Sequence, residues 1–526
     1  MKSAAGPAVT DVGRVTPSVP HKEEVRCTSR LLCDVSVRST LWEDPSTTRT
    51  DGTATRQKQA HEDALIEHRF TLAFQTRGDW NHCSLSQSHT ASWSRPGSTM
   101  TTLEDGYFHA VGSELPAMLD GMKLAAVAAA LYIIVRCLNL KSPTASPQIV
   151  YQDTPLNRYL LKICPMLSKE YIPPLLWGKS GHLQTALYGK MGRVNTPTPC
   201  GVRKLLPMQD GATATFDLFE PRGDHSTGDD ITMVICPGIG NHSEKNYIRT
   251  FVDHSQRQGY RCAVLNHLGA LPNMELTSPR MFTCGCTWEF AAMVGHIKRA
   301  FPQTRLVVVG FSLGGNIVCK FLGENRSNQD RVLCCVSVCQ GYNALRAQET
   351  FFQWDQCRRF YNFVLAEKMK KLILSHRSSL LDMSSSRIGD ADLSRLCAAT
   401  SLMQIDDSIM RKFHGYGSLK EYYEKESCVH YIHKVSVPLL LVNSSDDPLI
   451  HQSLLAIPRT LAEKMPNVIF ALTQHGGHLG FFEGAVLFPQ PLTWMDKVIV
   501  EYTDAICHWE KNRPACRRSG HQDMNF

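Results

Sequence analysis

The stretch VVVGFSLGGNIV, Val307–Val318, decides the fold of this chain. A run of β-branched residues ends at Gly310, and Ser312 follows between that glycine and Gly314. The valine run predicts a buried strand, and the residues from Leu313 onward predict a helix. Between a strand and a helix, Gly-x-Ser-x-Gly predicts a sharp turn that lifts the serine hydroxyl above a sheet, because the glycines let strand and helix approach closely. The five-residue pattern recurs by chance, so this setting is what favours a nucleophile over an ordinary turn.

Strand-like and helix-like segments alternate on both sides of this turn. Buried strands are predicted at 231–238, 261–267, 304–312, 331–340, 437–448 and 467–478, an alternating strand at 213–221, and helices at 244–260, 287–301, 313–325, 451–464 and 491–511. Continuous apolar strands separated by amphipathic helices predict an α/β fold, with a doubly wound, mostly parallel sheet covered on both faces. This domain is expected to span 148–511. Between 344 and 433 the segments are mostly helical, which predicts a helical cap insertion over the site.

The segment before that domain differs in character. Residues 1–99 are rich in Ser, Thr, Arg and Gly without a sustained apolar period, so they predict a disordered extension. LAAVAAALYIIVRCLNL, Leu124–Leu140, has three interpretations: a signal-anchor helix, a cleaved signal peptide or a buried helix. The anchor, over 122–140, is favoured because no clean cleavage site follows and KSPTASP is typical of an exposed linker. We expect a single-pass protein of the plasma membrane or an endomembrane, with its orientation left open.

Composition argues against several other classes of function. The net charge is +7 in 526 residues, and no run of Lys and Arg with interleaved aromatics occurs, so no nucleic-acid partner is expected. The nineteen cysteines are scattered and form no paired C-x-x-C pattern, so neither a metal site nor a disulfide framework is expected. Gly238-x-Gly240 follows a strand, but Ser243 stands where a dinucleotide site needs its third glycine. No cofactor is predicted.

A serine nucleophile needs a base and an orienting carboxylate, in the order Ser, acid, His at successive strand ends. The strand at 437–448 ends at Asp446 and Asp447, and the strand at 467–478 ends near His475 and His478. We choose Asp447, which lies deepest in its loop, with Asp446 as the fallback. We choose His478, which follows two glycines, and this leaves His475 as a surface or supporting residue.

Backbone amides are predicted to stabilise the oxyanion of the reaction. The helix that begins at Leu313 offers the Leu313 amide, and the turn at Pro237-Gly238 after an earlier strand offers the Ile239 amide. The chain also contains glycosylation sequons at Asn241, Asn325 and Asn443. Asn241 and Asn325 are the candidates, since Asn443 lies next to a buried strand.

Six separated motifs, in order, resemble one family. They are WGKSGHLQTALYG (Trp177–Gly189), DGATATFDLFEP, CPGIGNHSEKNYIRTFV, GFSLGGNIVCKFLGE, NSSDDPL and GGHLGFFEG. With GMKLAAVAAALYIIVRCLNLKSPTA before them, they resemble the membrane-anchored α/β-hydrolase domain-containing proteins 1 to 3, over Leu115–Trp509. The resemblance implies an α/β-hydrolase fold behind one membrane helix. It also places the family's nucleophile, acid and base on Ser312, Asp447 and His478.

The resemblance further implies a membrane serine hydrolase of monoacylglycerols and other lipid esters, whose activity is linked to progesterone. The expected partners are then an acylglycerol substrate, the bilayer and this steroid. Two alternatives remain: a lipid acyltransferase on the same residues, and a non-catalytic steroid- or lipid-binding protein. The complete Ser-Asp-His set argues against the second. Aromatic residues in the expected cap are interpreted mostly as cap core, with some lining an acyl-chain channel: Phe351, Phe352, Trp354, Phe360, Tyr361 and Phe363.

Overall fold

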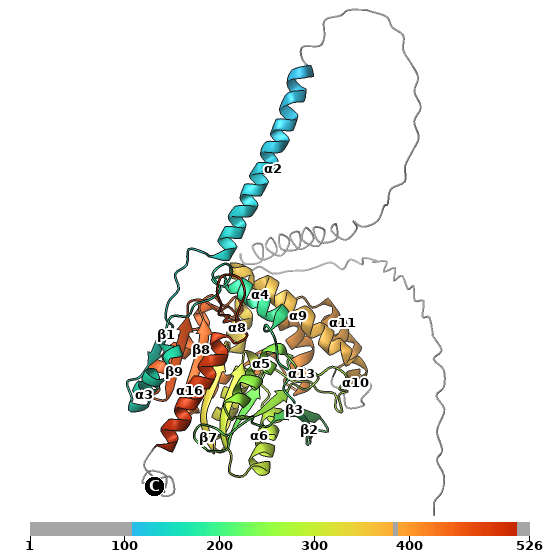
Figure 1. The fold of residues 1–526 in the computed structure, drawn as a ribbon. Helices are drawn as coiled ribbons and strands as arrows, with labels where there is room; N and C mark the ends of the chain where they lie inside the picture. The colour runs from blue at the N-terminus through green and yellow to red at the C-terminus, as the bar shows by residue number, and fades with distance from the viewer. Residues whose placement is uncertain (1–107, 382–387, 513–526) are drawn as a thin grey trace, which may run out of the picture. The chain divides into compact units, whose positions relative to one another are not determined.

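A nine-stranded sheet forms the frame of the chain in a computed structural model that describes residues 108–381 and 388–512 (Figure 1). Its order is β1-β9-β8-β7-β6-β4-β5-β3-β2. The strands from β9 to β5 in that order are parallel, and β1, β3 and β2 run antiparallel to their neighbours, which confirms the mostly parallel sheet. The predicted extension at 1–99 lies outside the described residues. The strands are β1 (Gln148–Tyr151), β2 (Val202–Pro207), β3 (Thr213–Phe219), β4 (Ile231–Cys236), β5 (Arg261–Asn266), β6 (Arg305–Phe311), β7 (Val332–Val338), β8 (Leu439–Ser444) and β9 (Val468–Thr473).

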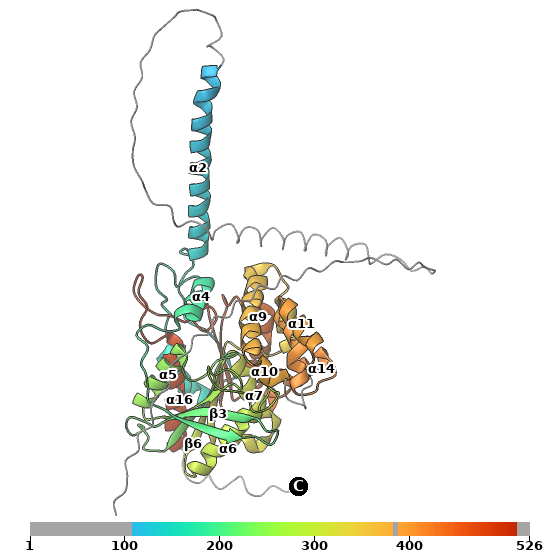
Figure 2. The ribbon, with the colours of Figure 1, turned by 90° about the vertical axis from the view of Figure 1, so that its right-hand side faces the viewer.

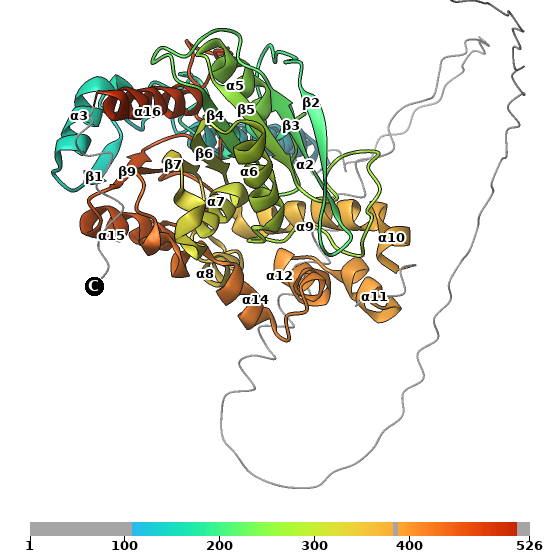
Figure 3. The ribbon, with the colours of Figure 1, turned by 90° about the horizontal axis from the view of Figure 1, so that it is seen from below.

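Helices cover both faces of this sheet, as Figure 3 shows. One face carries α3 (Pro155–Ile163), α5 (Asn246–Arg257) and α16 (Trp494–Lys511), and the other carries α6 (Trp288–Ala300), α7 (Leu313–Glu324) and α15 (Ala456–Lys464). All of them except α3 were predicted from the sequence. The helix α4 (Gly181–Met191) and the edge strands β1 and β2 were not.

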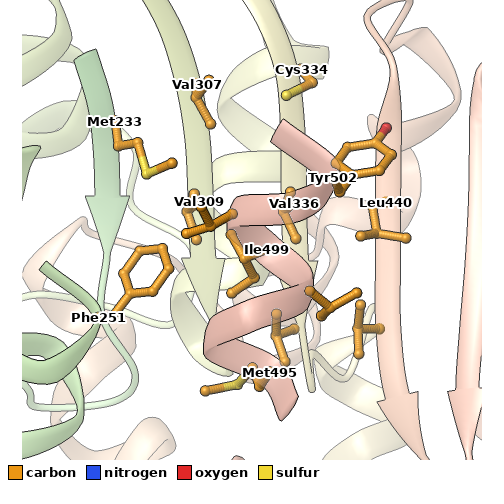
Figure 4. Packing of buried hydrophobic residues seen from close by; sticks show 14 of the residues in the cluster. Met233, Phe251, Val307, Val309, Cys334, Val336, Leu440, Met495, Ile499 and Tyr502 are labelled. Carbon is orange, nitrogen blue, oxygen red and sulfur yellow. The ribbon is translucent and has the colours of Figure 1, made fainter. Parts of the chain in front are cut away.

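The apolar run of β6 supplies both halves of the core. Val307, Val309 and Phe311 belong to the cluster under α5 and α16, whereas Leu306 and Val308 belong to the cluster under α6 and α7. Side chains alternate between the two faces of a strand, so a strand buried on both faces must be apolar at every position. Figure 4 shows Val307 and Val309 on the side of the sheet that α16 covers.

The chain between β7 and β8 is helical (Figure 2). Its buried residues form a third cluster, together with buried residues of the loop after β5 such as Leu268 and Met281. Phe351 is buried there, but Phe352, Trp354, Phe360 and Phe363 are exposed. The interpretation of this aromatic set as mostly core is therefore wrong. The helices of the insertion are α8 (Ala344–Thr350), α9 (Arg358–Ser375), α10 (Arg377–Leu381), α11 (Asp390–Ala398), α12 (Leu402–Ile405), α13 (Arg411–Phe413) and α14 (Leu419–Glu426), with a π-helical turn at Asp406–Met410.

The helix α2 (Phe108–Leu138) covers most of the predicted anchor at 122–140. Within the described part of the chain, no helix combines the length and the apolar character that crossing a membrane requires. In α2 the apolar run is short, because Lys123 precedes it and Arg136 interrupts its far end. The anchor predicted over 122–140 stays a prediction.

Candidate active site

Ser312 occupies a strained turn between β6 and α7. Its φ of 55° and ψ of −119° lie outside the regions that residues with a side chain prefer, and its amide donates to the Val338 carbonyl at 2.7 Å. A Cβ at Gly314 would stand 2.1 Å from the Cys236 carbonyl oxygen, and one at Gly310 would stand 2.5 Å from the Gly314 carbonyl oxygen. Because neither space admits a methyl group, both positions require glycine.

Three side chains form a hydrogen-bonded chain above the sheet. The Nε2 atom of His478 lies 2.8 Å from the Ser312 hydroxyl, and its Nδ1 atom lies 2.8 Å from an oxygen of Asp447. An ionised carboxylate only accepts hydrogen bonds, so Nδ1 carries the proton. In the neutral ring Nε2 is then an acceptor that faces the serine hydroxyl. The structure thus brings the three residues together in the order that proton transfer from serine requires.

The loop after β8 fixes the carboxylate of Asp447. One oxygen accepts the amides of Leu449 at 2.8 Å and Ile450 at 3.1 Å, which leaves the other to face His478. Both Asp447 and His478 are buried. Charge-assisted hydrogen bonds are stronger away from water, so the carboxylate can hold the imidazole in one orientation and stabilise it when it becomes protonated.

The helix α4 positions the loop of His478. The His478 amide donates to the Thr185 hydroxyl at 2.8 Å, and this hydroxyl donates to the Gly181 carbonyl at 2.7 Å. Gly477 has a φ of 55°, and a Cβ there would stand 2.4 Å from the same Gly181 carbonyl oxygen. The patterns of strands and helices gave no signal for Thr185, although it lies inside the motif that resembles a known family.

Asp446 and His475, the alternative acid and histidine of the sequence analysis, support the loops after β8 and β9. Asp446 accepts the Gly477 amide at 2.8 Å. His475 is buried, and its Nε2 atom lies 3.2 Å from the Ser142 hydroxyl and 3.0 Å from the Pro143 carbonyl oxygen. The two side chains stand 3.6 Å apart. Neither contacts Ser312, so their geometry suits a supporting place and not the surface.

The turn after β4 lies against the serine. A Cβ at Gly238 would stand 3.5 Å from the Cβ of Ser312, so the next residue, Ile239, begins beside the serine. Among the hydrogen bonds found in residues 108–381 and 388–512, none uses the amide of Ile239 or of Leu313. Both predicted amides therefore remain available to a negatively charged oxygen.

Two buried side chains hold this turn in place. The Tyr247 hydroxyl accepts the Gly238 amide at 3.0 Å, and His267 donates through Nε2 to the Pro237 carbonyl at 2.9 Å. Burial lowers the pKa of His267, so the ring is neutral at physiological pH and holds the turn without adding a charge. Sequence reasoning missed both residues, which come from α5 and from the end of β5.

Cys339 is a further neighbour of the site, and sequence reasoning did not connect it with the catalytic residues. It is fully buried at the end of β7 with a φ of 53°, and its sulfur, an Asp447 oxygen and a His478 ring nitrogen lie within 4.8 Å of one another. Such a set can in principle hold a metal ion. Burial and the Asp447 charge raise the pKa of the Cys339 thiol, so it keeps its proton, and the two other ligand atoms already bond to each other. An ion would have to displace both protons.

The helical insertion contacts both sides of the site. His182 on α4 lies 3.1 Å from the Tyr361 hydroxyl on α9, and the two rings stack. The fully buried Arg358 donates to the Pro448 carbonyl at 3.0 Å, directly after Asp447. The insertion therefore reaches the acid loop and the helix that holds the histidine loop.

The three sequons differ in their surroundings. Asn241 follows the turn beside Ser312 and donates to the Tyr247 hydroxyl at 3.4 Å, so a glycan there would enter the site. Asn443 is buried and accepts the Tyr342 hydroxyl at 2.8 Å. Asn325 is exposed at the end of α7, which makes it the accessible candidate.

Comparisons with known proteins agree with this geometry. Residues 231–485 match the family model described as alpha/beta hydrolase fold. "Monoacylglycerol lipase ABHD2" of Danio rerio is 81% identical over 405 residues, which cover 77% of this chain and 96% of that protein. The human protein of the same name is 71% identical over 406 residues, with the same coverage. "Abhydrolase domain-containing protein 2" of Drosophila melanogaster is 42% identical over 378 residues, 72% of this chain and 94% of that protein.

Proposed function

This chain belongs to the ABHD2 family of α/β-hydrolases, and on that premise we propose that it is a serine hydrolase that cleaves monoacylglycerols to glycerol and a fatty acid. The observation that carries the proposal is the unbroken chain of hydrogen bonds from Ser312 through His478 to Asp447. A serine beside a neutral imidazole that a carboxylate orients is equipped for acyl transfer.

The first half of the reaction forms an acyl-enzyme. The Ser312 oxygen attacks the ester carbonyl carbon while Nε2 of His478 takes the hydroxyl proton. The carbonyl oxygen becomes negatively charged, and the amides of Ile239 and Leu313 stabilise it. The bond between the acyl carbon and the glycerol oxygen then breaks, and His478 returns its proton to that oxygen. Asp447 stabilises the imidazolium throughout.

The second half reverses the roles with water as the nucleophile. His478 takes a proton from water, whose oxygen attacks the acyl carbon, and the bond to Ser312 breaks as the serine recovers its proton. The fatty acid then leaves. If a lipid alcohol replaced water at this step, the same residues would transfer the acyl group, so product analysis with and without an alcohol acceptor distinguishes the two reactions.

The helical insertion is the proposed cap of this site. Two contacts support this proposal: Arg358 bonds to the loop of the catalytic acid, and Tyr361 bonds to α4, the helix that holds the histidine loop. The resemblance also supports two further proposals: that the enzyme hydrolyses its substrate at a membrane, and that progesterone changes its activity. Hydrolysis of monoolein in vesicles, with progesterone titrated into the assay, tests the membrane activity, the response to progesterone and the substrate class.

Fluorophosphonate labelling with peptide mapping tests the nucleophile. We expect the label on Ser312, and we expect Ser312→Ala to lose labelling and to lower monoacylglycerol turnover at least about a thousandfold. Ser436→Ala is the matched control, since Ser436 is an exposed serine whose amide and hydroxyl both donate to the Gln329 side chain. Normal turnover by the Ser312→Ala protein would refute the proposed mechanism.

A further inference from the structure

Two loops near the site expose large apolar side chains. The loop before α4 exposes Ile172, Leu175 and Leu176, and the loop before α16 exposes Val486, Leu487 and Phe488, with exposed fractions between 42% and 80%. We call these six residues the apolar collar. Soluble surfaces rarely gather such side chains unless they meet an apolar partner.

The collar is a built surface, because the two loops bond to each other. The amides of Leu175 and Leu176 donate to the carbonyls of Ala485 and Val486 at 3.0 Å each, and the Trp177 indole donates to the Leu487 carbonyl at 2.7 Å. A bridge between Gly484 and Pro489 closes the second loop at its base. The polar backbone is thus paired inward, while the apolar side chains stay outside.

Gln184 joins the collar to the catalytic centre. Its fully buried amide donates to the Gly178 carbonyl at 2.7 Å and accepts the Phe482 amide at 2.9 Å, so it bonds to both collar loops. The next residue, Thr185, accepts the amide of His478. A molecule that meets the collar therefore meets the elements that hold the catalytic histidine.

Cationic side chains lie beside the collar. Lys179 follows the first loop and donates to the carbonyls of Leu140 and Ser142, at 3.4 and 2.6 Å, just after α2. Lys169 precedes the same loop and is exposed. Two acids lie nearby: Glu170, which accepts the Thr144 hydroxyl, and Glu501, which interacts electrostatically with Lys169. The described part of α2 also exposes large apolar side chains, from Met122 to Val135.

We propose that the apolar collar docks on the surface of a lipid bilayer, with Lys169 and Lys179 at the level of anionic headgroups. Apolar side chains flanked by lysines match a surface with an apolar interior and a negative rim. The inference rests on the proposed function, because a substrate dissolved in the bilayer then enters beside the loop of His478. The aromatic residues Phe360 and Phe363 at the start of α9 are exposed as well.

The test compares two substrates with the full-length protein. The collar variant carries Leu175→Ser and Phe488→Ser. The control carries Val202→Ser and Leu205→Ser, two apolar residues of β2 that are each 59% exposed, at the edge of the sheet away from β1. Each protein hydrolyses p-nitrophenyl butyrate in solution and monoolein in vesicles of phosphatidylcholine and phosphatidylglycerol.

We expect the collar variant to lose at least about tenfold in monoolein turnover, since two large apolar side chains no longer enter lipid. Its turnover of the soluble ester and both activities of the control should stay near those of the unmodified protein. Equal monoolein turnover by the collar variant and the unmodified protein would overturn the proposal. An equal loss on both substrates would also overturn it, because the loops would then only support the site. A dimer in solution that the collar substitutions dissociate would assign the surface to a second copy.

A readout that needs no hydrolysis separates this inference from the proposed function. In the Ser312→Ala protein, a Trp introduced by Phe488→Trp should be quenched by brominated phospholipids, whereas one introduced by Val202→Trp should not. Quenching with no esterase activity in the Ser312-intact protein would keep the docking surface and refute the hydrolase. Esterase activity without quenching would keep the hydrolase and refute the docking surface.

Discussion

Asp406 makes the stability of the helical insertion depend on pH. Its carboxyl group is buried at the start of the π-helical turn, and the Tyr423 hydroxyl donates to it at 2.8 Å. Burial raises its pKa from 3.8 to about 7, against the opposing effect of the Tyr423 hydrogen bond. We predict that Asp406→Asn stabilises the protein at alkaline pH and not at acid pH.

The sign follows from where the proton resides. Below about pH 4 the carboxyl group is protonated in the folded and in the unfolded protein, so burying it removes no charge from water. Between about pH 4 and 7 the folded protein keeps a proton that the unfolded chain has lost, so the free energy of unfolding falls as pH rises through this window. Above about pH 7 the contribution stays constant. The shift from 3.8 to about 7 corresponds to roughly 4 kcal/mol at the upper end.

The assay is thermal unfolding of the unmodified and Asp406→Asn proteins between pH 4.5 and 8.5. The asparagine oxygen can still accept the Tyr423 hydroxyl, so the two melting temperatures should nearly coincide at pH 4.5. At pH 8.5 the variant should melt about 5 °C higher for a domain of this size. Asp407→Asn is the matched control, because Asp407 is exposed and pairs with Arg411 at the surface. Parallel curves for the unmodified and Asp406→Asn proteins would refute the reasoning.

Two further predictions concern the site. Gly314→Ala should abolish both fluorophosphonate labelling and hydrolysis, because its Cβ would stand 2.1 Å from the Cys236 carbonyl oxygen; Gly189→Ala, where a Cβ meets nothing within 4 Å, should keep both. Full labelling of the Gly314→Ala protein would contradict the packing argument. Arg358→Met should lower kcat on a soluble ester about tenfold with a smaller change in KM, because the Pro448 carbonyl beside the catalytic acid loses its donor. Steady-state kinetics measure this split, and an unchanged kcat would show that the cap contact does not position the acid.

The sequence was sufficient for the parts of the fold that repeat a strong pattern. The strands β4 to β9 are apolar at nearly every position because both faces are buried, and the helices between them carry clear periodicity. The edge strands gave weaker signals. Most positions of β2 are exposed, so its residues need not be apolar, and β1 has four residues. Such short edge strands form because they hydrogen-bond to a neighbouring strand, and their own sequence gives little signal.

The candidate site was predictable to the extent that its residues stand at strand ends in a fixed order. Ser312, Asp447 and His478 each follow a strand, so topology alone brings them to one edge of the sheet. The residues that hold them gave no such signal. Gln184 and Cys339 act through contacts between segments far apart in the chain, and sequence periodicity does not report such contacts.

The aromatic residues of the insertion show a further reason why prediction failed. A run such as FFQWDQCRRFYNF is apolar enough to predict a core, yet Phe352, Trp354 and Phe360 face outward. Hydrophobic residues usually lie inside, but a protein surface still contains much apolar area. Local composition indicates how much apolar surface a segment carries. It does not indicate which of its side chains pack against the rest of the protein.

The first strand of the sheet also determines when the domain can be completed during synthesis. Strand β1 bonds to one neighbour in the sheet, β9, so that Gln148 faces Leu472 across almost the whole domain. A ribosome adding 5–20 residues per second leaves β1 without its partner for roughly 15–60 s. During that interval a chaperone can bind the exposed edge, and the loops of the catalytic acid and histidine have yet to be made. The nascent chain is therefore an inactive hydrolase until nearly all of it has left the ribosome.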